Sequence, residues 1–307
     1  MAKSPSWIHG ATDLHGPRFA EFHSGLTHYN ALRFQPGLPE DASEDQLSLE
    51  RAVAAAEIDF IEALRNEVAP LTNRIPDDPD GFLNWFERLK ETGPGQGDPL
   101  FPWLAAGATA EQMRWFLLQE VAGEAGFEDL LALTQVKMPV QPKLEMARNF
   151  WDEMGRGREK GMHGPMLERL AAYCELSPTP ETVVPEALAL GNTMIALAHH
   201  RRYAYHSVGA LGVIEMTAPT RAGYVDKGLR RLGIPAKKRH YFALHAVLDV
   251  KHSQEWNREV VRPLVAEDPR RARAIGEGAV MRLWHGARTF ECYRREFGFV
   301  DQHSHAA

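Results

Sequence analysis

Apolar residues recur at helical spacing through most of the chain from Ser43 onward, with polar residues on the opposite faces. Start signals such as Ser43-Glu-Asp-Gln46 and Thr109-Ala-Glu-Gln112 open helices, and prolines and glycines end them. No strand-like alternation persists anywhere in the sequence. We therefore predict an all-α fold, a single bundle whose helices cover about 43–68, 82–89, 109–135, 142–154, 166–174, 185–206, 208–232, 235–261 and 269–297.

The first 42 residues have a different pattern from the rest, because prolines and glycines are scattered through them. Over residues 1–42 we expect an irregular N-terminal arm that wraps the body, with a short helix near Phe19–Leu32. Residues 43–300 then form one helical-bundle domain, which is long enough to bury a substantial core.

Composition narrows the class of partner. A formal net charge of −6 argues against nucleic acid or an anionic membrane. The longest apolar stretch, Ala187–Ala198, is too short to span a bilayer. Cys174 and Cys292 lie far apart, so free thiols are expected rather than disulfides. No signal peptide is visible, and we expect a cytoplasmic protein.

The segment from His245 to His252 carries the most informative chemistry. On a helix, His245, Asp249 and His252 stand at positions i, i+4 and i+7, within about 60° of one another. One stripe thus presents two imidazoles and a carboxylate, a donor set that suits iron, manganese or zinc. The alternative is an ordinary polar stripe on a histidine-rich helix.

A second candidate pair follows an aromatic turn. Glu153 ends a helix beside Phe150 and Trp151, and His163 follows a glycine-containing loop. The apolar flank indicates that part of this turn is buried, and a buried carboxylate needs a cation or another partner. A surface helix end and an ordinary helix-start histidine remain the alternatives for these two residues.

Glutamates on two further helices extend the set. Glu215 lies inside an otherwise apolar helix and requires a partner, either a metal or an arginine such as Arg221. Glu120, Glu124 and Glu128 share one helix stripe at four-residue spacing, and one of them could ligate, with Glu120 preferred. Most stripes of this kind are solvated faces.

Together these segments offer three carboxylates and three imidazoles, and helices facing inward across a bundle are the usual scaffold for a two-iron carboxylate site. The paired Glu-x-x-His motifs of ferritin-like proteins are missing. The order and spacing instead resemble the haem-oxygenase-like di-iron oxidase superfamily, also described as iron-containing redox enzymes. The resemblance covers roughly residues 98–297 and rests on the candidate ligands Glu153, His163, Glu215, His245, Asp249 and His252.

The resemblance implies a haem-oxygenase-like helical bundle that binds two iron ions per chain, Fe(II) cycling with Fe(III), and uses O2 as co-substrate. It further implies that Glu153, Glu215 and Asp249 are the catalytic carboxylates. Some members add a glutamate from the first helix as a seventh ligand; this position does not align cleanly with the present sequence, and Glu120 is the preferred candidate for it. Members of such a group perform N-oxygenation, desaturation or oxidative C–C cleavage. A small amino-acid-like substrate from specialised metabolism is our expectation.

Partners follow from this chemistry. A small-molecule substrate is expected, with an external electron donor and a homodimer both compatible with the sequence. Arg202, Arg221 or Lys227 could bind a substrate carboxylate, although basic residues at helix ends are commonly solvated. Two other classes stay open. One is a metal-free enzyme of the same fold, either a cofactor-free oxidase or a thiaminase-like protein with a nucleophilic cysteine; the other is a non-catalytic all-α interaction protein with a vestigial metal site.

Overall fold

The computed structural model describes residues 5–38, 43–123 and 126–299, and the regular secondary structure within these ranges is helical, with an isolated bridge between Met154 and Met162. The α-helices are α1 (Phe19–Arg33), α2 (Glu44–Thr72), α3 (Pro79–Thr92), α4 (Leu100–Ala106), α5 (Ala110–Gly123), α6 (Phe127–Thr134), α7 (Val140–Glu153), α8 (His163–Tyr173), α9 (Pro185–His199), α10 (Ala204–Arg231), α11 (His240–Trp256), α12 (Arg262–Glu267) and α13 (Arg270–Glu296). Short 3-10 turns are η1 (Ser6–Gly10), η2 (Gly155–Gly157), η3 (Glu159–Gly161) and η4 (Arg201–Tyr203), and η5 (Asn257–Val261) is a π-helical turn. The predicted all-α fold is confirmed.

Both predicted start signals act as helix caps. The Ser43 hydroxyl accepts a hydrogen bond from the Gln46 amide at 3.1 Å. At the start of α5, the Thr109 hydroxyl accepts from the Gln112 amide at 3.2 Å, and the Gln112 side chain accepts from the Thr109 amide at 2.9 Å. These reciprocal bonds satisfy backbone donors that the first helical turn leaves without partners.

Three expected helices are divided in the structure. The one expected over 185–206 ends at His199 as α9, and after the short turn η4 the next helix, α10, begins at Ala204. The segment expected as one helix over 109–135 forms α5 and α6, because Gly126 adopts φ +70 before α6. The helix expected from Pro235 starts later, at His240, after a turn. It gives way to η5 and α12 where Pro263 has no amide proton to donate to the preceding turn.

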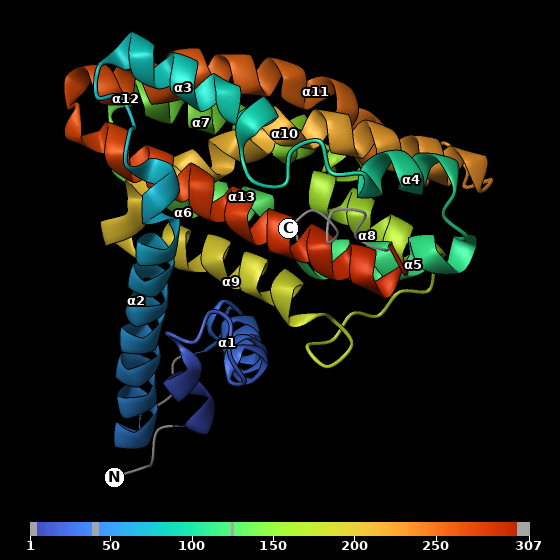
Figure 1. Ribbon diagram of the computed structural model, residues 1–307, viewed down its shortest axis with the longest axis horizontal. Coiled ribbons are helices and arrows are strands. Elements are labelled where there is room, and N and C mark those ends of the chain that lie inside the picture. Colours follow the sequence, from blue (N-terminus) through green and yellow to red (C-terminus); the bar gives the residue numbers. More distant parts are fainter. Residues whose placement is uncertain (1–4, 39–42, 124–125, 300–307) are drawn as a thin grey trace, which may run out of the picture.

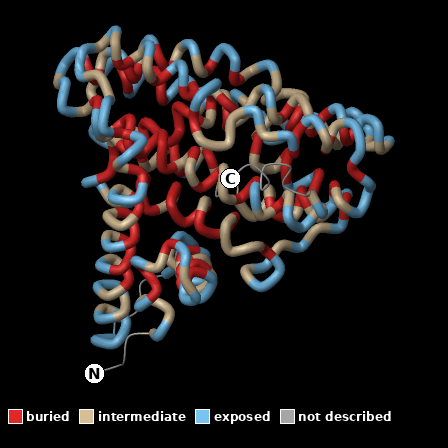
Figure 2. Tube along the Cα trace, in the orientation of Figure 1, coloured by how far each residue is buried: buried red, intermediate tan, exposed pale blue. Residues whose placement is uncertain are grey.

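The centre of the bundle is the crossing of α10 and α13, and it depends on two glycines. A Cβ on Gly209 would lie 1.7 Å from the carbonyl oxygen of Ile275, and one on Gly278 would lie 1.9 Å from that of His206. The two backbones therefore approach too closely for any side chain between them. Buried residues run along α9, α10 and α13, whereas the outer helices carry the exposed faces (Figure 2).

The N-terminal segment contributes to the core. The helix expected near Phe19–Leu32 is present as α1, which lies beside α2 and α9 at one end of the bundle (Figure 1). Phe22 and Leu26 belong to the same buried cluster as Phe60 of α2. The guanidinium of Arg33 donates to both carboxylate oxygens of Glu57, at 2.8 and 2.6 Å. Among the described helices, none is both long and apolar enough to cross a bilayer.

Candidate metal centre

The first group of candidate ligands is assembled by a tight loop between α7 and α8. Glu153 is the last residue of α7 and His163 the first of α8. Gly155 turns the chain with φ +59, and a Cβ there would lie 2.3 Å from the carbonyl carbon of Gly161. The loop brings Nδ1 of His163 to 2.7 Å from Oε2 of Glu153. His245 of α11 completes the group, its ring 4.7 Å from that of His163.

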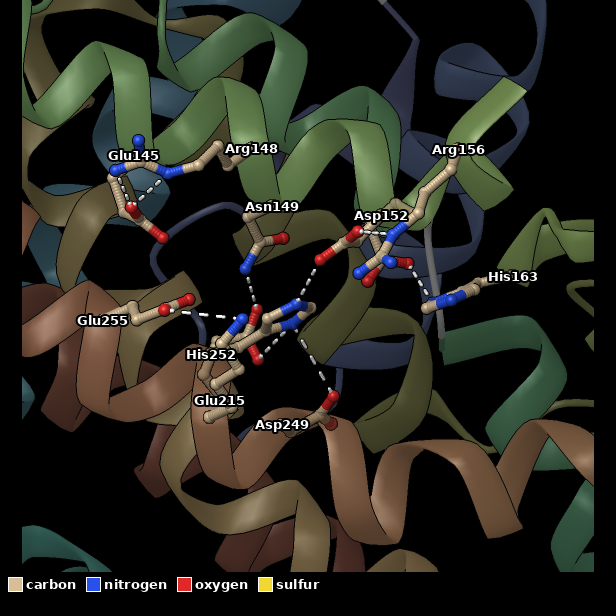
Figure 3. A network of polar contacts seen from close by, with 12 residues as sticks. Glu145, Arg148, Asn149, Asp152, Arg156, His163, Glu215, Asp249, His252 and Glu255 are labelled. Carbon is tan, nitrogen blue, oxygen red and sulfur yellow. Dashed lines mark hydrogen bonds and ion pairs between the residues drawn. The ribbon is translucent and has the colours of Figure 1, made fainter. Parts of the chain in front are cut away.

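The second group comes from α10 and α11. Nδ1 of His252 lies 3.6 Å from Oε2 of Glu215 and 4.0 Å from Oδ1 of Asp249 (Figure 3). All three side chains are buried. Asp249 and His252 share one face of α11 because they stand three residues apart, as the sequence pattern predicts. Glu215 is therefore not paired with Arg221, the alternative that the sequence left open.

The donor atoms within each group lie within 4.8 Å of one another. Metal ions bind nitrogen and oxygen ligands at about 2.0–2.2 Å, so two ligands of one ion lie up to about 4.4 Å apart, and small side-chain movements would let one ion reach all three atoms of a group. The two groups also adjoin, since Nδ1 of His245 lies 3.1 Å from each carboxylate oxygen of Asp249. The geometry thus provides two neighbouring candidate cation sites, each with carboxylate and imidazole donors.

Buried nitrogens without hydrogen-bond partners support a metal at both sites. Nδ1 of His163 and Nδ1 of His252 have no such partner among the described residues, although each faces a carboxylate. Burial raises the pKa of Glu215. Burial lowers the pKa of His252, but the Glu215 carboxylate, with Asp152 and Asp249, outweighs it and raises the pKa above its ordinary value. A bound cation would replace these protons and bind the exposed lone pairs.

Two residues that the sequence analysis did not single out support the second group. Oδ2 of Asp152 lies 3.1 Å from Nε2 of His252, and Arg156 is paired with the other oxygen of the same carboxylate at 2.6 Å. The amide nitrogen of Asn149 donates to Oε1 of Glu215 at 2.6 Å (Figure 3). Carboxylates that accept from the second nitrogen of a ligating histidine are a regular feature of metal sites. The signal for Asp152 was its position directly before Glu153.

Comparison with known proteins agrees with the geometry. The model of the iron-containing redox enzyme family matches residues 114–287, which is more than half of the chain and includes both groups. The chain belongs to this family. No curated protein matches it. Family membership and the helical architecture together confirm the expected haem-oxygenase-like bundle, and the protein is an iron-containing redox enzyme.

Candidate ligands from both groups line one cavity of about 150 Å³. Glu153, His245, Glu215 and Asp249 face it, and its apolar wall is formed by side chains that include Leu167, Ile214, Val225 and Phe290. A cavity of roughly this size accommodates a molecule such as benzene. The space beside the candidate metal centre is therefore suited to a small organic molecule rather than a long acyl chain.

The structure separates the glutamates of the α5–α6 region. Glu120 belongs to neither ligand group; it faces the cavity, 3.4 Å from the hydroxyl of Tyr293. Glu128 lies near the first group, where burial raises its pKa, Glu153 raises it further and His163 opposes the shift. Glu124 lies outside the described residues. Of the two that are described, Glu128 is the one whose pKa is influenced by members of a ligand group.

Among the three basic residues considered for a substrate carboxylate, Arg221 lines the cavity, whereas Arg202 and Lys227 are exposed and lie over tyrosine rings. The two cysteines are free. Burial raises the pKa of Cys174, and burial together with Glu186 raises that of Cys292 to about 11. Neither thiol is activated as a nucleophile, which disfavours the thiaminase-like alternative.

Proposed function

We propose that this protein is an O2-dependent non-haem di-iron oxidase or oxygenase that acts on a small amino-acid-like substrate. The observation that carries the proposal is the pair of adjoining, largely buried ligand groups, connected through the 3.1 Å contact between His245 and Asp249. A single group would fit a mononuclear site or an isolated structural ion. Two groups that share a contact and border one cavity fit a dinuclear centre with a substrate beside it.

Each ligand has a defined place in this proposal. Glu153, His163 and His245 would hold one iron, and Glu215, Asp249 and His252 the other. Three carboxylates offset most of the charge of two ferrous ions, and the neutral imidazoles complete the donor sets. When bound, the irons supply the electrons and the coordination positions that O2 activation requires. Glu128 is proposed as a further ligand of the first iron.

The surrounding residues keep the ligands in the required state. With its proton on Nε2, His252 donates a hydrogen bond to Asp152, and the unprotonated Nδ1 is left to bind the metal. Asn149 donates to Oε1 of Glu215 and so fixes the carboxylate with Oε2 toward His252. The apolar cavity wall excludes water from the space between the ligands and the substrate. The catalysed reaction would be N-oxygenation, desaturation or C–C cleavage of the substrate. An external electron donor would be needed where the substrate supplies too few electrons to reduce O2.

The proposal is tested by O2 uptake. Protein loaded anaerobically with ferrous iron is mixed with the small-molecule fraction of a cell extract and exposed to O2, and the wild type is compared with His252→Ala. Faster O2 consumption and depletion of a metabolite by the wild type alone would support the proposal. Equal uptake and the same metabolite profile for both proteins would overturn it.

A further inference from the structure

Among the residues that the structure describes, three charged side chains line the cavity without belonging to either ligand group. They are Arg221 of α10, Glu120 of α5 and Arg282 of α13. They come from three helices that are far apart in the sequence, so it is the packing of these helices that brings the three side chains together. The cavity therefore has two chemically distinct regions, one with the candidate metal ligands and one with two guanidinium groups and a carboxylate.

Arg221 is a cation held among aromatic rings. Its guanidinium lies 5.0 Å from the ring centre of Phe290 and 5.8 Å from that of Phe101. Its hydrogen bond to a side chain is a long one, 3.4 Å to the amide oxygen of Gln96. Asp98, which like Glu120 acts to raise the pKa of Arg221, is already paired with Arg294. Burial lowers the pKa of Arg221, and the neighbouring Arg282 lowers it further.

This environment leaves Arg221 short of partners. A guanidinium carries five N–H donors in a fixed planar fork, which matches the two oxygens of a carboxylate. No carboxylate lies within 4.0 Å of Arg221 among the residues that the structure describes. Removing a cation from water without an anion beside it costs free energy, which a ligand carboxylate would recover.

Glu120 offers the opposite charge to the same space. Burial raises the pKa of its carboxyl group, while Arg282 and Arg221 act in the opposite direction. Its closest hydrogen-bonding side chain is the Tyr293 hydroxyl at 3.4 Å. Glu120 and Arg221 thus influence each other electrostatically without forming an ion pair. The space between them suits a molecule with one group of each charge.

The positions along α10 set the size of that molecule. Arg221 is six residues from Glu215, which corresponds to about 9 Å along the helix axis. Ala218, between them, and Ala222, directly after Arg221, also line the cavity, and their short side chains leave room there. A ligand whose charged end is held at Arg221 would place a short side chain beside the candidate metal ligands.

We infer that Arg221, with Arg282 beside it, binds the carboxylate of the substrate while Glu120 binds its ammonium group, so that the cavity selects small zwitterionic amino acids. This inference rests on the proposed function and defines the substrate class of the same site. Glu120 acts here as a substrate-binding residue, and the side chain of the amino acid points toward the two ligand groups.

Ligand binding to the full-length, metal-free protein tests the inference. The probes are the standard amino acids, each compared with the carboxylic acid that lacks the amine and the amine that lacks the carboxylate, and binding is measured by calorimetry. At least one amino acid should bind with Kd below about 1 mM, and both of its analogues at least about tenfold more weakly. Preferred binding of a simple carboxylic acid or amine, or no amino-acid binding at all, would overturn the inference.

Variants separate the two charges. Arg221→Met should abolish amino-acid binding, and Arg221→Lys should weaken it while preserving the charge. Glu120→Gln should remove the preference for the amino acid over its amine-free analogue. Lys227→Met, an exposed position on the same helix, is the matched control and should bind as the wild type does. Circular dichroism checks folding. If correctly folded Arg221→Met and Glu120→Gln retain wild-type binding, the inference is wrong.

The two proposals fail in different ways. A protein that takes up two irons and consumes O2 but binds no amino acid would contradict the charge-based selection alone. A protein that binds an amino acid in the predicted manner but takes up no iron would contradict the proposed oxidase.

Discussion

Nε2 of His252 lies 3.1 Å from a carboxylate oxygen of Asp152, the residue that directly precedes the candidate ligand Glu153. Two consecutive side chains of α7 are thereby directed to different ligand groups: Glu153 to the first, and Asp152 to the histidine of the second. Since Arg156 holds the other oxygen of Asp152, the orientation of His252 is fixed from outside the centre.

Replacing Asp152 by asparagine should weaken binding of one iron without abolishing it. The amide cannot stabilise the His252 proton as a carboxylate does, and loss of such outer partners typically lowers metal affinity about 10–100-fold. Anaerobic ferrous titration measures this. The exposed Glu168→Gln on α8 is the control. Unchanged affinity for both ions would show that the contact between Asp152 and His252 has no role in metal binding.

Iron affinity should fall as the pH is lowered from 8 to 6. In the metal-free protein, the Glu215 carboxylate raises the pKa of His252 and burial raises that of Glu215, so both groups hold protons that the metal must displace. Each released proton weakens binding about tenfold per pH unit below the pKa of its group. Titrations at three pH values, with proton release measured in weak buffer, check this. Affinity independent of pH would contradict it.

Gly209→Ala should destabilise the protein by at least about 3 kcal/mol, because its Cβ would meet the Ile275 carbonyl oxygen, which is backbone and cannot rotate away. Gly223→Ala on the same helix is the matched control. Its Cβ would lie 3.8 Å from the Cβ of Ala246, an ordinary contact, so the better helix propensity of alanine should stabilise by up to about 1 kcal/mol. Urea unfolding compares them; equal stabilities would refute the close crossing of α10 and α13.

Glu277 provides a pH-dependent contribution to stability. Burial raises its pKa, but hydrogen bonds from His206, Arg65 and Arg273 outweigh burial and bring the pKa to about 2. Its stabilisation is therefore complete above the unfolded pKa of about 4.5 and is lost as the pH falls toward 2. Glu277→Gln should cost about 3 kcal/mol at pH 7 and much less at pH 3. An equal cost at both pH values would contradict this assignment.

Sequence periodicity predicted the elements and the local geometry of the site. Asp249 and His252 share a helix face because the α-helical repeat is 3.6 residues, and this needs no tertiary information. The break at Gly126 could not be predicted, since an isolated glycine is tolerated inside helices. The spacing of Glu153 and His163 indicated a loop, but not that Gly155 and Gly161 close it tightly.

Contacts between distant helices were beyond prediction from sequence. Glu120 and Arg221 lie about a hundred residues apart, and only the packing of α5, α10 and α13 brings them to one cavity. In the sequence, Glu120 was the preferred seventh ligand, but the spacing along its helix could not show which glutamate lies nearer the other candidate ligands. Arg221 was one of three basic residues considered for binding a substrate carboxylate, and the aromatic rings around it became visible only in the fold.

The most direct test of the two-site account is the number of ferrous ions bound per chain under anaerobic conditions. The wild type should bind two. His245→Ala and His252→Ala should each bind one, because each removes a ligand from a different group. His240→Ala, an exposed histidine on the same helix, should still bind two. Wild-type binding of one iron or none, or two irons retained in both ligand variants, would contradict the account.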